Sequence, residues 1–250
     1  MNPAGVCSND GYMSIVTTVC RAESQEQSQM KLREQLLQGK RAALFDMDGT
    51  LIESMGIWGD IDVEFLGERG IEVPVDLQKN IEGMSFSETA QYFKSTFDLS
   101  ETEEELKVIW NQMAYDKYRT VVPMKAGAFA FLQWLKDQGY ATAVCTSNSR
   151  ELIDMIVENK GIRQLVDFVV TACEVNAGKP APDIYLRAAE VLGVKPSECV
   201  VFEDIPAGLL AGIRAGMTTC AVEDSYSVYC MDEKRQMADF VIHDFMDLLD

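Results

Sequence analysis

Short apolar runs alternate with longer segments of helical periodicity after residue 40, and this alternation constrains the fold more than any other feature. The helical segments are AFAFLQWLKDQ, SRELIDMIVENK, PDIYLRAAEVLG and IPAGLLAGIRAG. Short apolar runs with the pattern of strands separate them. These runs are RAALF, YATAVCT, FVVTA, CVVFE, TTCAV and DFVI. Strands that alternate with helices predict an α/β fold with a Rossmann-like parallel sheet flanked by helices.

One block departs from this alternation. The segments WGDIDVEFLGERG, SFSETAQYFKSTF and ETEEELKVIWNQMAYDKYR have helical periodicity, and no strand pattern separates them. Pro123 and Gly127 then mark the return to the alternating pattern. We therefore predict an all-helical domain over 53–122, inserted into a core domain formed by 39–52 and 123–250. Residues 1–38, rich in Ser, Gln and Glu, are predicted to be a disordered extension.

The charge balance disfavours two classes of partner. With 22 basic and 40 acidic residues, a formal net charge of -18, the average surface repels nucleic acids and anionic membranes. A phosphorylated ligand would need a local cation or backbone N–H groups. The 7 cysteines contain no C-x-x-C pair, which is typical of free thiols in a reducing cytoplasm. Since no apolar run reaches membrane-spanning length, we expect a cytoplasmic protein without nucleic-acid or membrane partners.

Two aspartates follow the first predicted strand, in RAALFDMDGT. Asp46 closes the strand, at the edge of a parallel sheet where ligands bind. Gly49 breaks the strand pattern, so the chain can turn and return Asp48 toward the same cleft. Two converging carboxylates repel each other by about 4 kcal/mol at 4 Å separation and an intermediate dielectric constant. This pair therefore needs a counter-ion or a shared proton, unless both side chains only cap the following turn.

Oxygen ligands of this kind select magnesium or calcium. A calcium loop of the type D-x-D-x-D-G would need an acid where Thr50 stands and a glycine where Leu51 stands. The preceding segment AALF is also strand-like rather than helical. A calcium loop of this type is therefore disfavoured, and the other strand ends must decide what the two acids bind.

Three further strand ends also carry polar side chains. The second strand ends in Thr146, Ser147 and Asn148, which can bind a phosphoryl oxygen or cap the next helix. Lys179 lies in the Gly- and Pro-rich loop NAGKPAPDIY, either as a site cation or as a surface lysine. The run CVVFEDIPAG ends in two adjacent acids, Glu203 and Asp204, which suit a magnesium site or a helix dipole.

This ordered set resembles the motifs of the haloacid dehalogenase superfamily. FDMDGT is similar to the first motif, CTSN to the second, GKPAPDIY to the third and FEDIPAG to the fourth. The resemblance spans residues 41 to about 245 and is closest to the phosphatase branch, which includes β-phosphoglucomutase-like and phosphoglycolate phosphatase-like members. The helical block 53–122 is similar to the cap domain of that branch.

The resemblance implies a role for each motif residue. Asp46 would be the nucleophile that forms an aspartyl phosphate, and Asp48 the general acid and base. Thr146 and Lys179 would complete the catalytic set. Mg²⁺ would be bound by the Asp46 carboxylate, the Asp48 main-chain carbonyl and Asp204, with Glu203 holding metal-bound water. The predicted substrate-binding residues are Gly49, Thr50, Ser85, Phe86, Ser147 and Asn148.

Retaining Asp48 favours phosphate esters, because a leaving alkoxide needs a proton, and the related dehalogenases and phosphonate hydrolases lack this aspartate. Sugar phosphate mutases of the same branch carry a cap-loop arginine in G-x-S-R, whereas this chain has GMSFSE with Phe86 in that place. Arg69 and Lys79 are the cap cations that could replace it. We therefore predict a magnesium-dependent phosphomonoester hydrolase acting on a small phosphorylated metabolite.

Two alternatives stay open, a β-phosphoglucomutase-type mutase and a non-catalytic binding module with the same fold. Trp58, Ser85 and Phe86 either shape a leaving-group pocket or serve the cap core and helix caps. The sequence is compatible with a monomer.

Overall fold

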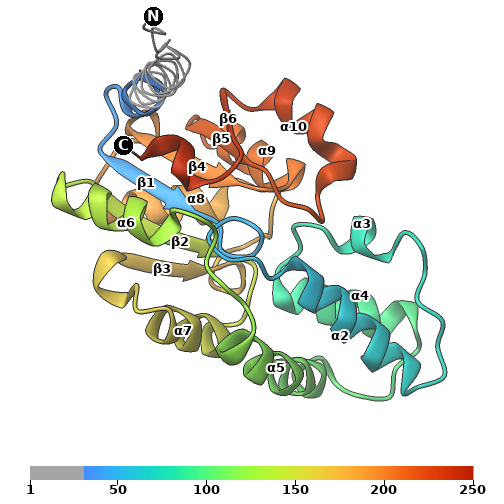
Figure 1. Ribbon diagram of the computed structural model, residues 1–250. Helices are drawn as coiled ribbons and strands as arrows, with labels where there is room; N and C mark the ends of the chain where they lie inside the picture. Colours follow the sequence, from blue (N-terminus) through green and yellow to red (C-terminus); the bar gives the residue numbers. More distant parts are fainter. Residues whose placement is uncertain (1–30, 250) are drawn as a thin grey trace, which may run out of the picture.

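The computed structural model of the protein describes residues 31–249 (Figure 1). Within this range six strands form one parallel sheet in the order β3-β2-β1-β4-β5-β6. The strands are β1 (Ala42–Phe45), β2 (Ala141–Thr146), β3 (Phe168–Thr171), β4 (Cys199–Glu203), β5 (Thr218–Val222) and β6 (Phe240–Ile242). All four residues of β1 are buried, as expected for a central strand covered on both faces. The predicted α/β fold is confirmed.

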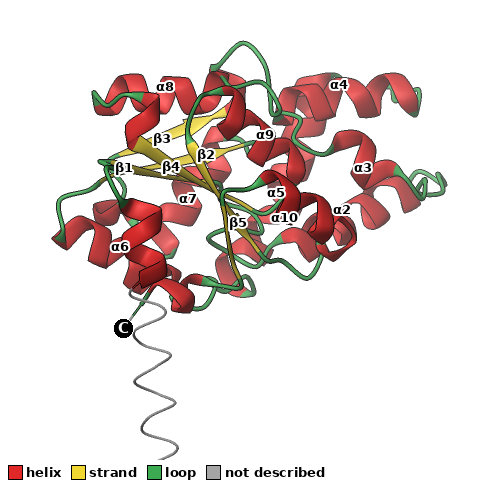
Figure 2. Cartoon of the chain, turned by 90° about the horizontal axis from the view of Figure 1, so that it is seen from above, coloured by secondary structure: helices red, strands yellow, loops and turns green. Residues whose placement is uncertain are grey.

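Helices cover both faces of the sheet (Figure 2). On one face, Phe45 and Val144 pack in a cluster with α6 (Ala128–Asp137) and α7 (Arg150–Asn159). On the other face, Leu44 and Cys145 pack with α8 (Asp183–Leu192) and α9 (Pro206–Arg214), and α10 (Met231–Met237) lies beside α9. Short 3₁₀ helices complete the core domain: η1 (Arg163–Leu165), η2 (Ala172–Glu174), η3 (Pro196–Glu198), η4 (Val228–Cys230) and η5 (Phe245–Leu248).

The predicted N-terminal extension is wrong for its last residues. Residues 31–37 form a helix in which Leu36 and Leu37 are buried in the core cluster of β1. Arg33 donates a hydrogen bond to the Leu248 carbonyl and stacks over Trp134. Burial of the apolar face of this segment stabilises its helical conformation against the core. The rest of the predicted extension, residues 1–30, lies outside the described residues.

Four helices form the cap between β1 and α6 (Figure 1). They are α2 (Met55–Gly67), α3 (Leu77–Ile81), α4 (Phe86–Thr96) and α5 (Glu103–Thr120). Capping boxes fix the starts of α4 and α5, where Ser85 and Thr102 accept hydrogen bonds from backbone N–H groups. Edge-to-face contacts of Phe65 and Phe93 with Trp110 form an aromatic core within the cap.

Two adjacent linkers connect the cap to the core. The Glu53 N–H donates to the Pro123 carbonyl over 3.1 Å, and the Lys125 N–H donates to the Leu51 carbonyl over 2.9 Å. Ile52 also forms an antiparallel bridge with Met124. Because both linkers are joined in this way just beyond the end of β1, the cap lies over the carboxyl ends of the strands.

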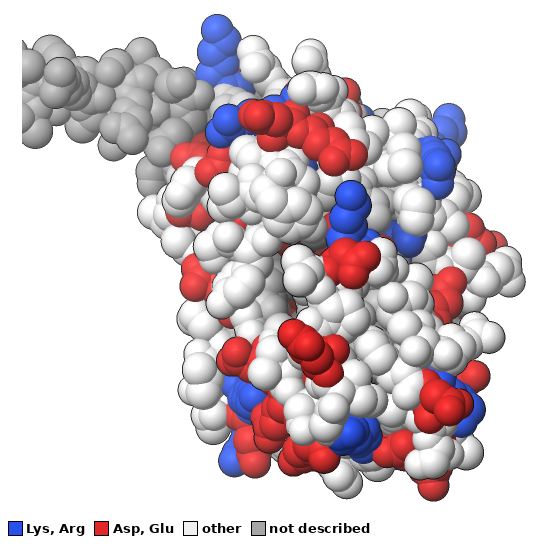
Figure 3. Space-filling view, turned by 90° about the vertical axis from the view of Figure 1, so that its right-hand side faces the viewer, with Lys and Arg blue, Asp and Glu red and all other residues white. Residues whose placement is uncertain are grey.

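The surface carries charges of both signs, and most of the described cysteines are buried. On the face in Figure 3, basic side chains lie singly or in small groups among acidic ones. Within residues 31–249, none of the helices has the combination of length and apolar character needed to cross a membrane. In the described chain Cys145, Cys199, Cys220 and Cys230 are buried free thiols, whereas Cys173 is exposed. Cys7 and Cys20 lie outside the described residues.

Candidate active site

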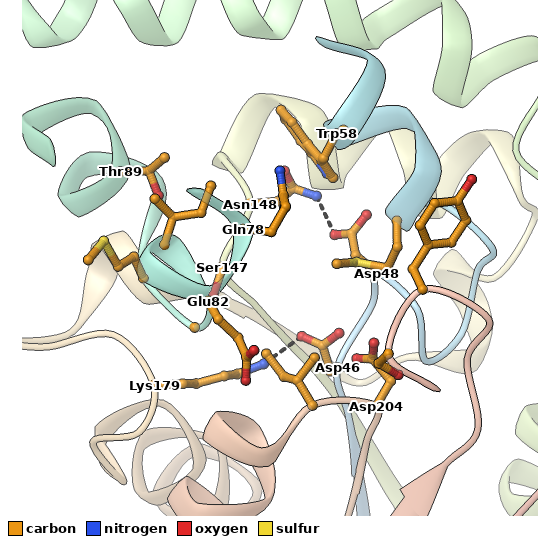
Figure 4. A pocket seen from close by; sticks show the side chains of 18 of the residues that line it. Asp46, Asp48, Trp58, Gln78, Glu82, Thr89, Ser147, Asn148, Lys179 and Asp204 are labelled. Atoms are coloured by element: carbon orange, nitrogen blue, oxygen red, sulfur yellow. Dashed lines mark hydrogen bonds and ion pairs between the residues drawn. The ribbon is translucent and has the colours of Figure 1, made fainter. Parts of the chain in front are cut away.

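Asp46 and Lys179 form a buried ion pair at the carboxyl edge of the sheet (Figure 4). The Asp46 N–H donates to the Phe202 carbonyl over 3.0 Å, which holds Asp46 beside the end of β4. Lys179 Nζ lies 2.5 Å from Asp46 Oδ1 and 2.6 Å from Glu203 Oε1. Burial disfavours the ammonium ion, but the two carboxylates outweigh this effect and raise the pKa of Lys179. Lys179 is therefore a fixed cation at the site.

Three carboxyl groups converge beside this cation. Oxygen atoms of Asp46, Glu203 and Asp204 all lie within 4.8 Å of one another. Burial raises the pKa of Glu203 to about 7, against the charge of Lys179. Burial, followed by the charges of Asp46 and Glu203, raises the pKa of Asp204 well above its usual value. One lysine does not balance this concentration of negative charge.

Two oxygens of this cluster have no hydrogen-bond partner among the described residues. They are Glu203 Oε2 and Asp204 Oδ2, both fully buried. Buried carboxylate oxygens without partners are costly unless an ion satisfies them. Hard oxygen donors suit divalent cations such as Mg²⁺ and Ca²⁺. The residues therefore fit a divalent cation held by Asp46, Glu203 and Asp204.

The turn after β1 brings Gly49 against Asp204. Gly49 has a φ of +78°, and a Cβ atom at this position would lie 2.2 Å from Asp204 Oδ2. Its N–H donates to the Ile52 carbonyl over 2.9 Å and so closes the turn. The predicted role of Gly49 in substrate binding stays a prediction, since Gly49 does not line the cavity described below. Gly49 permits the close approach of the turn to Asp204.

The Gly49→Ala substitution is expected to lower the rate of the phosphate ester hydrolysis predicted from the sequence by at least ~100-fold, since the methyl group would displace Asp204 from a site that tolerates little misplacement. The matched control is Gly139→Ala, because Gly139 has a φ of +79° and no atom within 4 Å of the added Cβ. Both variants should lose about 1–2 kcal/mol of unfolding free energy to backbone strain. Equal activities of the two variants, measured beside urea unfolding curves, would contradict this role of Gly49.

Asp48 belongs to a separate hydrogen-bond network. Ser54 Oγ donates to Asp48 Oδ1 over 2.5 Å, and Tyr118 from α5 donates to the same oxygen. Asn148 Nδ2 donates to Asp48 Oδ2 over 2.6 Å (Figure 4). Burial, with a smaller contribution from Asp46, raises the pKa of Asp48 to about 6. The Asp48 carboxyl is thus fixed in orientation and poised to exchange a proton near neutral pH.

The second motif lies where the sequence places it. Ser147 and Asn148 line the cavity above Asp46. Thr146 is buried, and its hydroxyl accepts a hydrogen bond from the Asn148 N–H over 3.1 Å, but it does not line this cavity. Thr50 also lies off the cavity wall, where its hydroxyl donates to Asp204 Oδ1 over 3.3 Å. The predicted roles of Thr146 and Thr50 in substrate contact stay predictions.

A cavity of about 240 Å³ separates the core residues from the cap. The core side contributes Asp46, Asp48, Lys179 and Asp204, and the cap side contributes Trp58, Asp62, Gln78, Phe86 and Trp110 among others. Its volume is smaller than the roughly 300–1,000 Å³ of pockets that hold drug-sized ligands. A small metabolite is therefore the ligand that this space suits.

The cap is docked against the core around the cavity. The Phe86 N–H donates to the Ser147 carbonyl over 3.0 Å. Tyr229 donates from the core to Glu82 over 2.7 Å. A Cβ atom on Gly56 would lie 2.3 Å from the Tyr226 hydroxyl, so α2 also contacts the loop before α10 closely. These contacts limit the access of water to the carboxyl groups.

The cap residues that could bind a second phosphate group are engaged elsewhere or lie away from the cavity. Phe86 is buried and packs edge-on against Trp58 and Trp110, so it forms both cap core and cavity wall. Ser85 caps α4 and does not line the cavity. Arg69 is bound to Glu101 and stacks over Phe65. Neither Arg69 nor Lys79 lines the cavity, so neither replaces the arginine that the mutase motif has at the position of Phe86.

Sequence reasoning missed several residues that shape the site. Tyr118 binds Asp48, and Tyr185 from α8 donates a hydrogen bond to Glu203 Oε1. Lys234, fully buried, donates to the Asp204 carbonyl over 2.8 Å. Tyr118 and Lys234 lie outside the four motifs, and Tyr185 ends the third motif without having been singled out. Only the tertiary structure brings them to the site.

Asp62 is a further buried carboxyl group, located in the cap one helical turn after Trp58. Burial raises its pKa from 3.8 to about 7, although Gln78 donates a hydrogen bond to it over 2.5 Å. The folded state therefore binds an extra proton between these two values. The stability that this proton contributes is complete below pH 3.8 and is lost as the pH rises through about 7.

We compare the unfolding free energy of the wild type with that of Asp62→Asn. The wild-type value minus the variant value is expected to fall as the pH rises from about 4 to about 7, the interval set by the two pKa values, and to stay constant at higher pH. Urea unfolding of both proteins across this range measures the difference. Parallel pH profiles of the two proteins would contradict the raised pKa of Asp62.

Comparison with known proteins identifies the class that this fold and site define. The model of the haloacid dehalogenase-like hydrolase family matches residues 40–216. Because this match covers more than half of the chain, the protein belongs to that family and is a hydrolase. The four motifs and the inserted helical cap agree with this assignment.

Individual relatives include both a phosphatase and a mutase. Hexitol phosphatase A of Escherichia coli (strain K12) is 32% identical over 203 residues, 80% of this chain and 89% of the relative. β-Phosphoglucomutase of Mycobacterium bovis is 29% identical over 240 residues, 84% of this chain and 91% of the relative. The crystal structure of CbbY from Rhodobacter sphaeroides in complex with phosphate has a TM-score of 0.74 and 22% identity, covering 84% of this chain and 96% of that chain. This last likeness concerns the fold.

Proposed function

We propose that the protein is a magnesium-dependent phosphomonoester hydrolase that acts on a small phosphorylated metabolite through an aspartyl phosphate at Asp46. The observation that carries the proposal is the position of Asp46, which lies at the cavity with Lys179 2.5 Å from Oδ1 and with Glu203 and Asp204 beside it. A carboxylate so placed can attack phosphorus while the neighbouring charges balance the phosphoryl group.

The reaction uses Asp46 and Asp48 in turn. Asp46 attacks phosphorus, the bond between phosphorus and the ester oxygen breaks, and Asp48 protonates the leaving alcohol. Asp48 then accepts a proton from the water that attacks the aspartyl phosphate, which releases inorganic phosphate and restores Asp46. Ser54, Tyr118 and Asn148 hold the Asp48 carboxyl in place for both proton transfers.

The cation and Lys179 have complementary tasks. Lys179 contacts Asp46 and Glu203 and so fixes the nucleophile. A bound Mg²⁺, held by the carboxylates of Asp46 and Asp204 with Glu203 beside them to hold metal-bound water, would supply the positive charge that the phosphoryl group needs in this acidic protein. The main-chain carbonyl of Asp48 is the further ligand that the family resemblance implies.

Hydrolysis is favoured over a mutase reaction by the cavity wall. Phe86 stands where a cap-loop arginine would bind a second phosphate, and Arg69 is bound to Glu101 instead. A neutral ring offers no substitute for a bidentate anion contact. After phosphoryl transfer to Asp46, water is thus the expected acceptor.

Phosphate release from p-nitrophenyl phosphate tests the proposal. We expect release to stop after EDTA treatment and to return when MgCl₂ is added in excess. A rate that is unchanged by EDTA would contradict the metal requirement. Absence of release from a wide panel of phosphate esters would favour a binding module, and conversion of glucose 1-phosphate to glucose 6-phosphate with a bisphosphate activator would favour the mutase.

A further inference from the structure

Three polar groups on the cap side of the cavity have no part in the proposed phosphoryl chemistry. Asp62 is 6% exposed and accepts one hydrogen bond, from Gln78 Nε2 to Oδ2 over 2.5 Å. Trp110 is 2% exposed, and its indole N–H has no hydrogen-bond partner among the described residues. Asp62, Gln78 and Trp110 all line the cavity. A buried donor without a partner is costly, so a donor and an acceptor at one cavity wall point to a ligand group that satisfies both.

A hydroxyl group matches this wall because it can donate one hydrogen bond and accept another. It can donate to the Asp62 carboxyl and accept from the Trp110 N–H. Gln78 lines the cavity (Figure 4), and its amide orients Asp62 and offers further polar contacts. The rings of Trp58 and Phe86 provide apolar surface for the carbon skeleton between the hydroxyl groups.

The charges around the cavity exclude a second anionic group on the leaving alcohol. Among the described residues that line the cavity, Lys179 is the only cation, and it is held between Asp46 and Glu203. The cap side contributes two acids, Asp62 and Glu82, and neither lysine nor arginine. A second phosphate or a carboxylate would lose its hydration without gaining a counter-ion.

We propose that Asp62, Gln78 and Trp110 form a leaving-group subsite that selects a neutral alcohol with at least one hydroxyl beyond the ester oxygen. The substrate is then the monophosphate of a small polyol or sugar, and neither a bisphosphate nor a phosphorylated acid. This inference rests on the proposed phosphatase function and adds to it the residues that read the leaving group. The three residues determine specificity, while Asp46 and Asp48 perform the chemistry.

Two matched substrates test the subsite through turnover. Sorbitol 6-phosphate and hexyl phosphate share a linear carbon chain but differ in their hydroxyl groups. We expect the wild type to prefer sorbitol 6-phosphate by ~100-fold or more in kcat/KM, and to hydrolyse fructose 1,6-bisphosphate more slowly than sorbitol 6-phosphate. The substitutions Asp62→Leu, Gln78→Leu and Trp110→Phe should each lower the preference by at least ~10-fold, mainly through KM. Trp110→Phe removes the N–H and keeps an aromatic ring, so it tests the donor if Asp62→Leu fails to fold.

The matched control is Gln91→Leu, because Gln91 is an exposed cap glutamine away from the cavity. This variant should keep the wild-type preference. An unchanged preference in Trp110→Phe and in the folded variants of Asp62 and Gln78 would overturn the subsite. Equal hydrolysis of fructose 1,6-bisphosphate and sorbitol 6-phosphate by the wild type would also overturn it.

Calorimetric binding separates the subsite from the proposed catalysis. Binding is measured either with the wild type, kept with Mg²⁺ at a temperature where turnover is negligible, or with the Asp46→Asn variant. Each protein should bind sorbitol 6-phosphate at least ~10-fold more tightly than hexyl phosphate. If no phosphate ester is hydrolysed but this difference in affinity is found and is lost in Trp110→Phe, the phosphatase function fails and the subsite stands. Equal affinities for the two esters would overturn the subsite whatever the outcome for catalysis.

Discussion

The Asp46→Asn substitution is expected to lower kcat for p-nitrophenyl phosphate by at least ~10⁴-fold, because the amide that replaces the carboxylate is a poor nucleophile. The amide has nearly the same shape, and it removes one of three converging negative charges. We therefore expect the variant to fold and to keep its place beside Lys179. Steady-state phosphate release, with thermal unfolding as a check on folding, measures the effect.

The control for this substitution is Asp60→Asn, which removes the same charge from an exposed position of α2. Its rate should lie within about a factor of two of the wild type, since surface substitutions rarely disturb a distant site. Removal of the nucleophile should leave far less than about one tenth of the wild-type rate. If Asp46→Asn keeps more than that, Asp46 is not the nucleophile.

The Lys179→Met substitution is expected to reduce both activity and stability. Lys179 is 1% exposed at its side chain and contacts Asp46 and Glu203 over 2.5 Å and 2.6 Å. Removing it leaves two buried carboxyl groups without their cation, which costs about 3 kcal/mol of unfolding free energy. The loss of a preorganised charge at the phosphoryl site should lower kcat by ~10³-fold. Urea unfolding and phosphate release on the same preparation measure the two effects.

Lys79→Met provides the comparison, because Lys79 is exposed on the cap and does not line the cavity. This variant should retain wild-type activity and unfolding free energy. A Lys179→Met protein with wild-type stability would show that the buried ion pair is not maintained in solution. Full activity in the same protein would remove Lys179 from the proposed mechanism.

The sequence predicted the sheet well because each strand carries its signal locally. A run such as AALF is apolar at every position, as a central parallel strand buried on both faces requires. The order of strand ends then brought Asp46, Lys179 and Glu203 to one edge. Residues 31–37 were included in the predicted extension because their burial depends on contacts with Trp134 and Leu248, which lie far away in the sequence.

The cap side of the site was less predictable for a physical reason. Tyr118 and Asp62 lie within regular helices, where a polar or aromatic residue reads as an ordinary surface or core position. Their importance arises only when the cap packs over the strand ends and turns them toward Asp48 or the cavity. For Gly49 the position in the motif was predictable, but the hydrogen bond from its N–H to the Ile52 carbonyl inside the turn was not.

The central claim is that the phosphoryl group passes through Asp46. Rapid acid quenching of the Mg²⁺-loaded protein during turnover of p-nitrophenyl phosphate, followed by borohydride reduction and peptide mass spectrometry, tests it most directly. Borohydride reduces an aspartyl phosphate to homoserine, so the account predicts homoserine at position 46 in the wild type and none in Asp46→Asn. Phosphate release without any modified peptide, or a phosphoryl group on another residue, would contradict it.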